Sequence, residues 1–320
     1  MAITGAGGFI GLRMAERARE RGMRVRGLDL GAEAARRAEA LGFETIVGDV
    51  NDADAVHRLC VGASVVFHTA AIVDEGGDWA KFRRVNVDGT RHVASVAREA
   101  GVPRFIHLSS VMVYGFEYPR FVSEEGPLRG EGNPYCQTKI ESEEALRPLH
   151  RPGSFETIVI RPGDVYGPGS VPWVVRPAEL MKRGLFVLIG GGRGIMNHVH
   201  VDNLIDGIFA ALDRGATGEA FNLTDGAETT FREYFTRLGA LVGRKGFPSL
   251  PKPLAIAAFA AMARGARAFG RKSLAEPSAV PFVTRPHPYS IEKARSWLGY
   301  EPKVSLDDGM RQLAASLGTR

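Results

Sequence analysis

The sequence is poor in cysteine, with only Cys60 and Cys136 among 320 residues. These two positions form no metal-ligand spacing, and they do not suggest a disulfide framework. Such sparse cysteine use fits a reducing compartment, so we expect a cytoplasmic location.

Long apolar runs are also missing. No run approaches the roughly 20 residues that span a bilayer, and no signal peptide, internal repeat or low-complexity tail is visible. The chain begins abruptly, with "MAIT" before the first glycine. A natural N-terminus that extends a few residues further upstream is one interpretation of this start.

A concentrated patch of one charge sign is absent as well. The 41 Lys and Arg exceed the 36 Asp and Glu by only five, and the basic residues alternate with acids, as in "RMAERARERGMR" (13–24). This pattern is typical of a solvated helix face rather than a nucleic-acid-binding stripe. We therefore expect a small-molecule ligand and no nucleic-acid partner.

Short apolar runs alternate with amphipathic stretches over the first half of the chain. Strands are predicted at 24–30, 43–50, 64–71, 104–110 and 155–163, and helices at 10–22, 31–41, 52–61, 79–100 and 134–149. Strand–helix–strand units at this spacing predict an α/β fold with a doubly wound parallel sheet of the Rossmann type. Such sheets bind ligands at the carboxyl ends of their strands.

The alternation weakens after residue 163. A Gly/Pro-rich loop follows at 163–173, a short strand leading into a helix is predicted at 197–212, and 226–320 reads as mostly helical with a Pro-rich break at 247–254. We predict a Rossmann domain over 1–163 and about 197–223. A smaller, mostly helical substrate lobe would comprise 164–196 and 224–320.

A glycine-rich turn, "TGAGGFIG" (4–11), joins the first strand to the first helix. Gly5, Gly8 and Gly11 follow GxxGxxG spacing, whereas GxGxxG fails because Ile10 stands at its last position. Glycine permits a tight turn and close approach to a pyrophosphate, and a helix N-terminus offers free N–H groups. The turn therefore predicts phosphate binding.

Two acids end the next two strands. Asp29 is placed to hydrogen-bond the ribose hydroxyls of a dinucleotide and to repel a 2′-phosphate, which favours NAD over NADP. Arg36 and Arg37, on the following helix, favour NADP instead. Asp49 has two interpretations, contact with the adenine amine or capping of the helix that follows.

The segment "PYCQTK" (134–139) places Tyr135 and Lys139 four positions apart on one helix face. A neighbouring ammonium is expected to lower the pKa of a tyrosine toward working pH. The alternative is an ordinary solvated helix face. Pro134 is expected to start this helix, and Cys136 points about 100° away from Tyr135 and is not a candidate.

Eight motifs in order give the chain a wider resemblance. They are "TGAGGFIG" (4–11), "GDV" (48–50), "VFHTAA" (66–71), "NVDGT" (86–90), "LSSVMVYG" (108–115), "YCQTK" (135–139), "IRPGDVYGPG" (160–169) and "HVHVDNLIDG" (198–207). Together they resemble the extended short-chain dehydrogenase/reductases, in particular the epimerase/dehydratase and 3β-hydroxysteroid dehydrogenase-like branch.

The resemblance implies roles for individual residues. Catalysis would fall to Ser110, Tyr135 and Lys139, with Ser109 a weaker claimant to the serine role. Tyr135 and Lys139 would also contact the cofactor NAD. The other cofactor residues would be Gly5, Gly8, Phe9, Ile10 and Gly11 at the pyrophosphate, Asp29 at the ribose, Asp49 and Val50 at adenine, Thr69, Ala70, Ala71 and Asn86 along the site, and Pro162 and Gly163 beside the nicotinamide.

The range of expected substrates is limited by positions where this sequence differs from the sugar-nucleotide enzymes of that family. Met196 stands where they typically carry Arg, and Asp164 where they often carry Asn, so a diphosphate is disfavoured. Val111 and Met112 replace the acid pair typical of dehydratases. We predict an NAD-dependent oxidoreductase for an apolar, steroid- or sterol-like secondary alcohol or ketone. The alternatives are a sugar-nucleotide epimerase or dehydratase and a non-catalytic NAD-sensing regulator, which usually lacks the tyrosine or the lysine.

The sequence leaves open the role of one apolar helix, the role of four histidines and the state of assembly. The apolar helix at 253–270 would pack within the lobe, cover an apolar substrate or rest weakly on a membrane surface. His198 and His200 share a strand face but have no third ligand nearby, so no metal is expected, and His68 and His107 are expected in the core. By analogy with the family, a homodimer is an assembly open to the chain.

Overall fold

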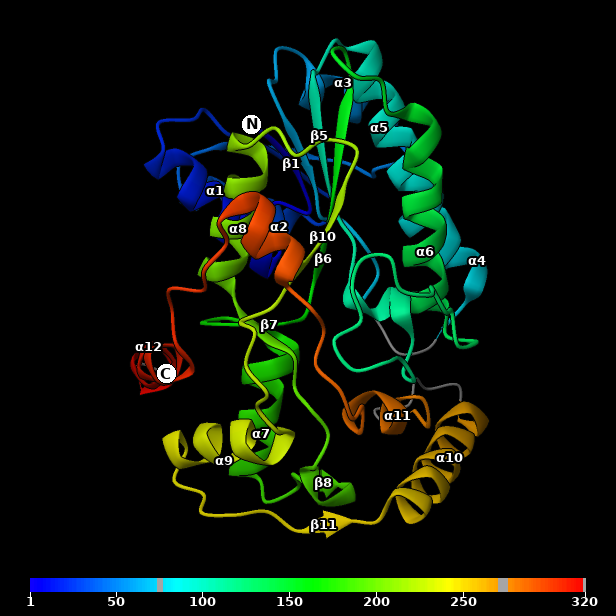
Figure 1. Ribbon diagram of the computed structural model, residues 1–320, viewed down its shortest axis with the longest axis vertical. Coiled ribbons are helices and arrows are strands. Elements are labelled where there is room, and N and C mark those ends of the chain that lie inside the picture. Colours follow the sequence, from blue (N-terminus) through cyan, green and yellow to red (C-terminus); the bar gives the residue numbers. More distant parts are fainter. Residues whose placement is uncertain (74–76, 270–275, 319–320) are drawn as a thin grey trace.

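The structure is a computed structural model, and it describes residues 1–73, 77–269 and 276–318. A parallel sheet flanked by helices fills the upper half of Figure 1, and a group of helices and short strands lies below its carboxyl edge. The predicted doubly wound α/β fold is confirmed.

The large sheet has seven strands in the order β10-β6-β5-β4-β1-β2-β3, and every pair is parallel. The strands are β1 (Ala2–Thr4), β2 (Arg26–Asp29), β3 (Glu44–Val47), β4 (Val66–His68), β5 (Arg104–Leu108), β6 (Glu156–Pro162) and β10 (Ala220–Leu223). The chain runs outward from β1 to β3 and then crosses back to β4. This reversal creates a switch point beside β1, where such sheets bind ligands.

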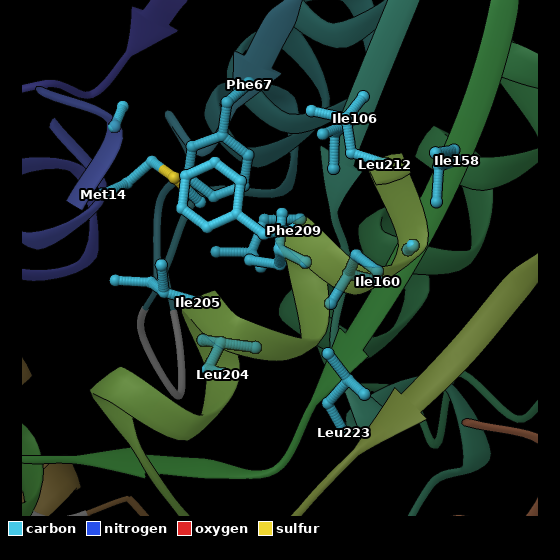
Figure 2. Close-up of a cluster of buried hydrophobic side chains, with 14 of the residues drawn as sticks. Met14, Phe67, Ile106, Ile158, Ile160, Leu204, Ile205, Phe209, Leu212 and Leu223 are labelled. Carbon is cyan, nitrogen blue, oxygen red and sulfur yellow. The ribbon is translucent and has the colours of Figure 1, made fainter. Parts of the chain in front are cut away.

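Helices cover both faces of this sheet. One face carries α1 (Phe9–Glu20), α2 (Ala32–Ala40) and α8 (Val201–Asp213), and the other carries α3 (Ala53–Cys60), α5 (Gly89–Glu99) and α6 (Pro134–Leu146). Neighbouring residues of one strand enter opposite cores, as Phe67 and Val66 do, because side chains alternate along a strand. Figure 2 shows the core beneath α1 and α8, where Phe67 and Phe209 meet.

The predicted helix at 79–100 is one run with a π-helical centre. It comprises α4 (Trp79–Phe82), a π-helical turn over 83–88 and α5. The strand and helix predicted at 197–212 are β9 (His198–His200) and α8, although β9 pairs with β7 (Asp164–Tyr166) outside the large sheet.

The lower part of the molecule has its own apolar cluster around Tyr234. Its further elements are α7 (Arg176–Lys182), β8 (Leu188–Ile189), α9 (Phe231–Leu241), β11 (Ser249–Leu250), α10 (Lys252–Ala268), α11 (Ala279–Val283) and α12 (Leu306–Gly318). Gly270, the end of the predicted apolar helix, lies outside the described residues. In the ranges that the structure describes, no helix has both the length and the apolar character that crossing a bilayer requires.

Candidate active site

The glycine turn between β1 and α1 is fixed by close backbone contacts. Gly5 has a φ of +66°, and a Cβ there would lie 3.1 Å from the backbone of Ala70. A Cβ on Gly11 would lie 2.2 Å from the Gly5 carbonyl oxygen. Glycine is therefore required at both positions for the turn to close beneath the helix.

The N-terminus of α1 is open to an anion. Gly8 is its N-cap, and among the described residues no side chain caps the helix and no acid lies in its first turn. Because the first N–H groups of a helix have no partners within it, the N–H groups of Phe9 and Ile10 can donate hydrogen bonds to a phosphate. The residues present therefore fit the pyrophosphate of a dinucleotide.

Asp29 stands at the end of β2, directly beside this turn. Its carboxylate accepts the Gly7 N–H at 3.0 Å and the Gly31 N–H at 3.3 Å. Arg37 borders the same turn and donates to the Gly7 carbonyl at 3.2 Å. The acid that favours NAD and the arginine that favours NADP thus both border the glycine turn.

Asp49 does not cap the following helix, so that interpretation was wrong. Asp52 is the N-cap of α3 and accepts the N–H groups of Asp54 and Ala55. Asp49 instead accepts the Asn51 N–H at 2.9 Å and pairs with Arg84 at 3.2 Å. The nearer acid, three residues further along, satisfies the helix end.

Val50 and Asn86 are buried and connect neighbouring segments. Val50 is buried, and a Cβ on Gly89 would lie 2.7 Å from its side chain. The Asn86 amide accepts the Ile72 N–H at 2.8 Å and donates to the Thr138 hydroxyl at 3.1 Å. Asn86 therefore ties the segment after β4 to α6.

The segment 69–71 follows β4 and is anchored to β1. The N–H groups of Thr69 and Ala70 both donate to the Thr4 hydroxyl, at 3.2 and 3.3 Å. Ala71 continues the segment and is partly exposed. These residues border the glycine turn through the contact between Ala70 and Gly5.

Helix α6 brings Tyr135 and Lys139 into the site. It begins at Pro134, as predicted, and Asn133 caps it by accepting the Tyr135 N–H at 2.9 Å. Lys139 is only 3% exposed and donates to the Leu108 carbonyl at 2.7 Å. The solvated-face interpretation of this helix is therefore wrong for Lys139.

Two serines end β5, and the structure separates them. Ser109 donates to Glu143 at 2.5 Å, and Glu143 in turn forms an ion pair with Arg161 at 2.6 Å. Ser110 is the residue whose hydroxyl neighbours that of Tyr135. Ser110, Tyr135 and Lys139 thus meet, whereas Ser109 is held in a buried ion-pair network.

The protonation of the pair differs from the expectation. Burial raises the pKa of Tyr135 to about 12, and the neighbouring Ser110 hydroxyl offsets only part of this rise. Burial also lowers the pKa of Lys139 to about 8, against the opposing effect of Glu143. The Lys139 ammonium lies 5.9 Å from the centre of the Tyr135 ring. The predicted lowering of the Tyr135 pKa was wrong because desolvation of the phenolate dominates.

The end of β6 passes close to another backbone. Pro162 ends this strand, and a Cβ on Gly163 would lie 2.0 Å from the Asn197 carbonyl oxygen. The Gly163 N–H donates to Leu223 on β10 at 3.0 Å. The motif "RPGD" therefore needs its glycine for backbone packing.

An apolar wall surrounds Tyr135, and local motifs did not predict its farther half. Tyr135 packs in one cluster with Met112, Phe116, Cys136 and, from α11, Phe282. Phe282 is in turn stacked by the guanidinium of Arg285, 4.2 Å from its ring centre.

Arg285 forms a buried ion pair with Asp164. Its Nη2 donates to that carboxylate, and both side chains are almost completely buried. Its Nη1 lies 3.6 Å from the Met112 sulfur, and its Nε has no hydrogen-bond partner among the described residues. One signal was available in the sequence, because a buried Asp164 requires a cation from somewhere else in the chain.

The four candidate histidines serve other purposes. His68 and His107 are buried, as predicted. His198 bonds Asp225 at 2.9 Å and Thr229 at 2.8 Å, and His200 caps α8. Across the described ranges, no group of three His, Cys, Asp or Glu side chains is arranged to hold a metal.

Comparisons with known proteins agree with this geometry. The model of the NAD dependent epimerase/dehydratase family matches residues 1–224. A 4-hydroxy-2-methyl-3-oxo-4-farnesyl-3,4-dihydroquinoline-1-oxide ketoreductase from Stigmatella aurantiaca is 30% identical over 97% of this chain and 94% of its own. A 2-alkyl-3-oxoalkanoate reductase from Stenotrophomonas maltophilia is 30% identical over 98% of both chains.

A solved structure shows the same fold. UDP-glucose 4-epimerase from Thermotoga maritima superposes with a TM-score of 0.79 at 23% identity, covering 99% of this chain and 98% of the other. The family match spans well over half of the chain, and it includes the glycine turn, Ser110, Tyr135 and Lys139. The chain therefore belongs to the NAD dependent epimerase/dehydratase family of short-chain dehydrogenase/reductases, and it is an NAD-dependent enzyme.

Proposed function

We propose that this enzyme is an oxidoreductase that interconverts a secondary alcohol and a ketone on an apolar, uncharged substrate, which includes steroid-like molecules. The observation that carries the proposal is the apolar cluster around Tyr135, whose nearby cation Arg285 is already neutralised by Asp164. A substrate that binds beside this wall would contact aromatic and thioether side chains rather than an unpaired charged side chain.

The dinucleotide would be held along the carboxyl edge of the sheet. The open N-terminus of α1 suits its pyrophosphate, and Asp29 suits its adenosine ribose. Asp49 and Val50 border the adenine end, whereas residues 69–71, Asn86 and the Pro162–Gly163 segment border the nicotinamide end. When bound, NAD supplies the hydride acceptor, and NADH the hydride donor.

Tyr135 and its neighbours would manage the proton. With its pKa raised to about 12 by burial, Tyr135 is a neutral phenol near pH 7 and can donate to a ketone oxygen. The carbonyl then gains a hydride at carbon and a proton at oxygen, and oxidation reverses both transfers. Ser110 can donate a hydrogen bond to the same oxygen, and the nearby Lys139 ammonium would stabilise the phenolate that remains.

We also propose a division of the chain into two functional parts. Residues 1–163 and about 197–223 contain the glycine turn, Asp29 and the seven strands of the large sheet. Residues 164–196 and 224–320 contribute Phe282 to the apolar wall and, beside it, the ion pair of Asp164 and Arg285. We assign the dinucleotide to the first part and substrate selection to the second.

A sugar-nucleotide epimerase remains the rival function, because the Thermotoga maritima enzyme shares the fold. At 23% identity, this similarity shows only that the two proteins share a fold. A nucleotide diphosphate needs cations that are free to pair with it. Met196 is fully buried in the apolar cluster of the lower part, and Arg285 is engaged by Asp164.

A substrate panel tests the assignment. Turnover of the alcohol with NAD and of the ketones with NADH is followed by NADH absorbance, whereas conversion of UDP-glucose to UDP-galactose, which leaves no net NADH, is followed by chromatography. It should contain a 3β-hydroxysteroid, a 2-alkyl-3-oxoalkanoate, the methyl ester of that acid, and UDP-glucose. We expect turnover of the steroid or the ester, with the ester preferred over the free acid. Turnover confined to UDP-glucose would overturn the substrate class, and preference for the acid would overturn the neutral wall.

The role of Tyr135 is tested by Tyr135→Phe. Loss of the proton donor should lower kcat by about 10²- to 10⁴-fold while NAD affinity, measured by calorimetry, stays nearly the same. Tyr300→Phe is the matched control, since it removes a buried tyrosine hydroxyl whose one hydrogen bond within the described ranges goes to the Thr224 carbonyl. Retained turnover in Tyr135→Phe would rule out the proposed proton transfer.

A further inference from the structure

The lower end of the molecule carries an unusual apolar helix. Of the residues of α10 whose side chains the structure describes, only Ala255 and Ala263 are buried. Leu254, Ile256 and Met262 are each about half exposed, and Phe269, just after the helix, is 82% exposed. The interpretation of this helix as a packing element of the lobe is therefore wrong for most of its surface.

A second segment adds apolar side chains to the same end. Leu185 and Val187 are exposed just before β8, and β8 pairs with β11, which leads directly into α10. Figure 1 shows β8, β11 and α10 together along the bottom of the molecule, at the end farthest from the large sheet. Exposed apolar side chains gathered in this way mark an interaction surface.

The two segments at this end are also basic. Residues 180–200 and 243–269 contain no Asp or Glu. Among the side chains that the structure describes, these two segments carry seven exposed cations, namely Lys182, Arg183, Arg193, Arg244, Lys245, Lys252 and Arg264. The two segments touch, since Arg244 donates to the Lys182 carbonyl at 2.6 Å. Elsewhere acids and bases alternate, so the basic character is local.

We propose that residues 182–193 and 244–269 form a docking surface for the face of an anionic lipid bilayer. Exposed apolar side chains can enter the boundary between headgroups and acyl chains, while Lys and Arg pair with anionic headgroups. A second copy of the chain is the poorer occupant, because two such surfaces would oppose cations to cations. The surface also adjoins the apolar wall, since α10 packs on α11, which carries Phe282.

Vesicle flotation of the full chain tests this proposal without any substrate, so its outcome is independent of the proposed function. The chain should float with phosphatidylcholine vesicles that contain phosphatidylglycerol and not with phosphatidylcholine alone. Binding should weaken when the ionic strength rises from about 0.1 M to about 1 M, because the Debye length falls from about 10 to about 3 Å. Equal binding to both kinds of vesicle, or binding to neither, would overturn the proposal.

Two double variants locate the surface. Lys252→Gln with Arg264→Gln should lower partition into anionic vesicles about 30-fold, from the roughly fivefold contribution of each cation. Lys81→Gln with Arg98→Gln removes the same charge from the helices beside the large sheet. It should leave partition into anionic vesicles nearly unchanged. If both pairs lower it equally, net charge alone governs binding, and the proposed surface is wrong.

Ile256→Glu with Met262→Glu should abolish flotation. Val47→Glu with Val61→Glu, which changes two equally exposed apolar side chains beside the large sheet, should not. NAD binding by all four variants checks that each has folded. A second copy of the chain is the occupant if the wild type sediments as a dimer and the Ile256→Glu, Met262→Glu variant sediments as a monomer. If, in addition, neither of these two proteins binds vesicles, the proposal fails.

Discussion

The two sides of the candidate active site differ in whether their polar and charged groups are already paired within the protein. On the side that we assign to the dinucleotide, polar groups remain open. Within the described part of the chain, no side chain caps the N-terminus of α1, and the hydrogen bonds to the Asp29 carboxylate come from backbone N–H groups alone. On the substrate side, Asp164 and Arg285 neutralise each other within an apolar wall. An anionic, hydroxyl-rich ligand suits the first arrangement, and an uncharged apolar ligand suits the second.

The difference has an energetic cause. A buried charge needs a partner, because desolvation costs several kcal/mol for each ion. The substrate side therefore has to satisfy its charges within the protein, whereas the exposed edge of the glycine turn can leave its donors to water until a ligand arrives. Variants that change one side at a time should show how separate the two arrangements are.

The largest expected effect comes from breaking the buried pair. Asp164→Asn should lower the free energy of unfolding by about 3–5 kcal/mol, because it leaves the Arg285 guanidinium buried without its counter-ion. Asp164→Leu combined with Arg285→Met should be less destabilised than Asp164→Asn, since neither charge remains. Urea unfolding of the three proteins measures both differences.

The matched control is an exposed ion pair. Glu33→Gln makes the same chemical change in the pair with Arg37, where both side chains are at least half exposed. Such a pair contributes about 0–1 kcal/mol. If Asp164→Asn costs no more than Glu33→Gln, Arg285 keeps solvent or another partner, and the contrast between the two sides of the site does not hold.

The residues that we assign to the dinucleotide could be proposed from the sequence, because their determinants are local. The glycine turn, Asp29 and the Tyr135–Lys139 pair each lie within a short motif whose strand or helix also follows from the local pattern. The farther substrate wall could not be predicted in this way. Arg285 meets Asp164 across 121 residues, and only the folded chain brings Phe282 to Tyr135.

Three errors share another cause, since each depended on burial or on a competing neighbour. The sequence shows that Lys139 follows Tyr135 but not that both are desolvated, so the direction of the Tyr135 pKa shift was wrong. Asp49 looked like a helix cap because it ends a strand, yet Asp52 stands closer to the helix start. Helix α10 reads as apolar, but no pattern tells that its apolar surface faces outward.

Lys139 lies between the two sides, and its burial predicts a pH dependence of stability. Its pKa falls from the ordinary value of 10.5 to about 8 on folding. Between these values the unfolded chain binds one proton more, so this group makes the free energy of unfolding increase with pH, by at most about 3 kcal/mol. Lys139→Met should lose this increase, as measured by urea unfolding of the NAD-free protein at pH 8 and pH 10.

Other buried groups oppose this increase within the same window. Burial raises the pKa of Cys60 and Cys136 from 9.0 to about 12, so their contributions to stability decline above pH 9, and the contribution of Tyr135 declines above pH 10. The effect of Lys139 is therefore the difference between Lys139→Met and the wild type at each pH. Lys303→Met, which removes an exposed lysine, should leave the dependence between pH 8 and pH 10 intact. If the free energy of unfolding changes with pH identically in Lys139→Met and the wild type, Lys139 is solvated in the NAD-free protein.

The smallest expected effect concerns Asp29 and separates its charge from its hydrogen bonds. Asp29→Asn keeps an oxygen that can accept the Gly7 N–H, but it removes the charge that repels a 2′-phosphate. It should narrow the preference for NAD over NADP about tenfold, a change of about 1.4 kcal/mol, mainly through tighter NADP binding. Asp29→Ala should in addition weaken NAD, because the ribose loses its acceptor. Calorimetric titration with both dinucleotides measures these changes, and the same NADP affinity in Asp29→Asn as in the wild type would assign the cofactor preference to Arg37 or to the shape of the turn rather than to this carboxylate.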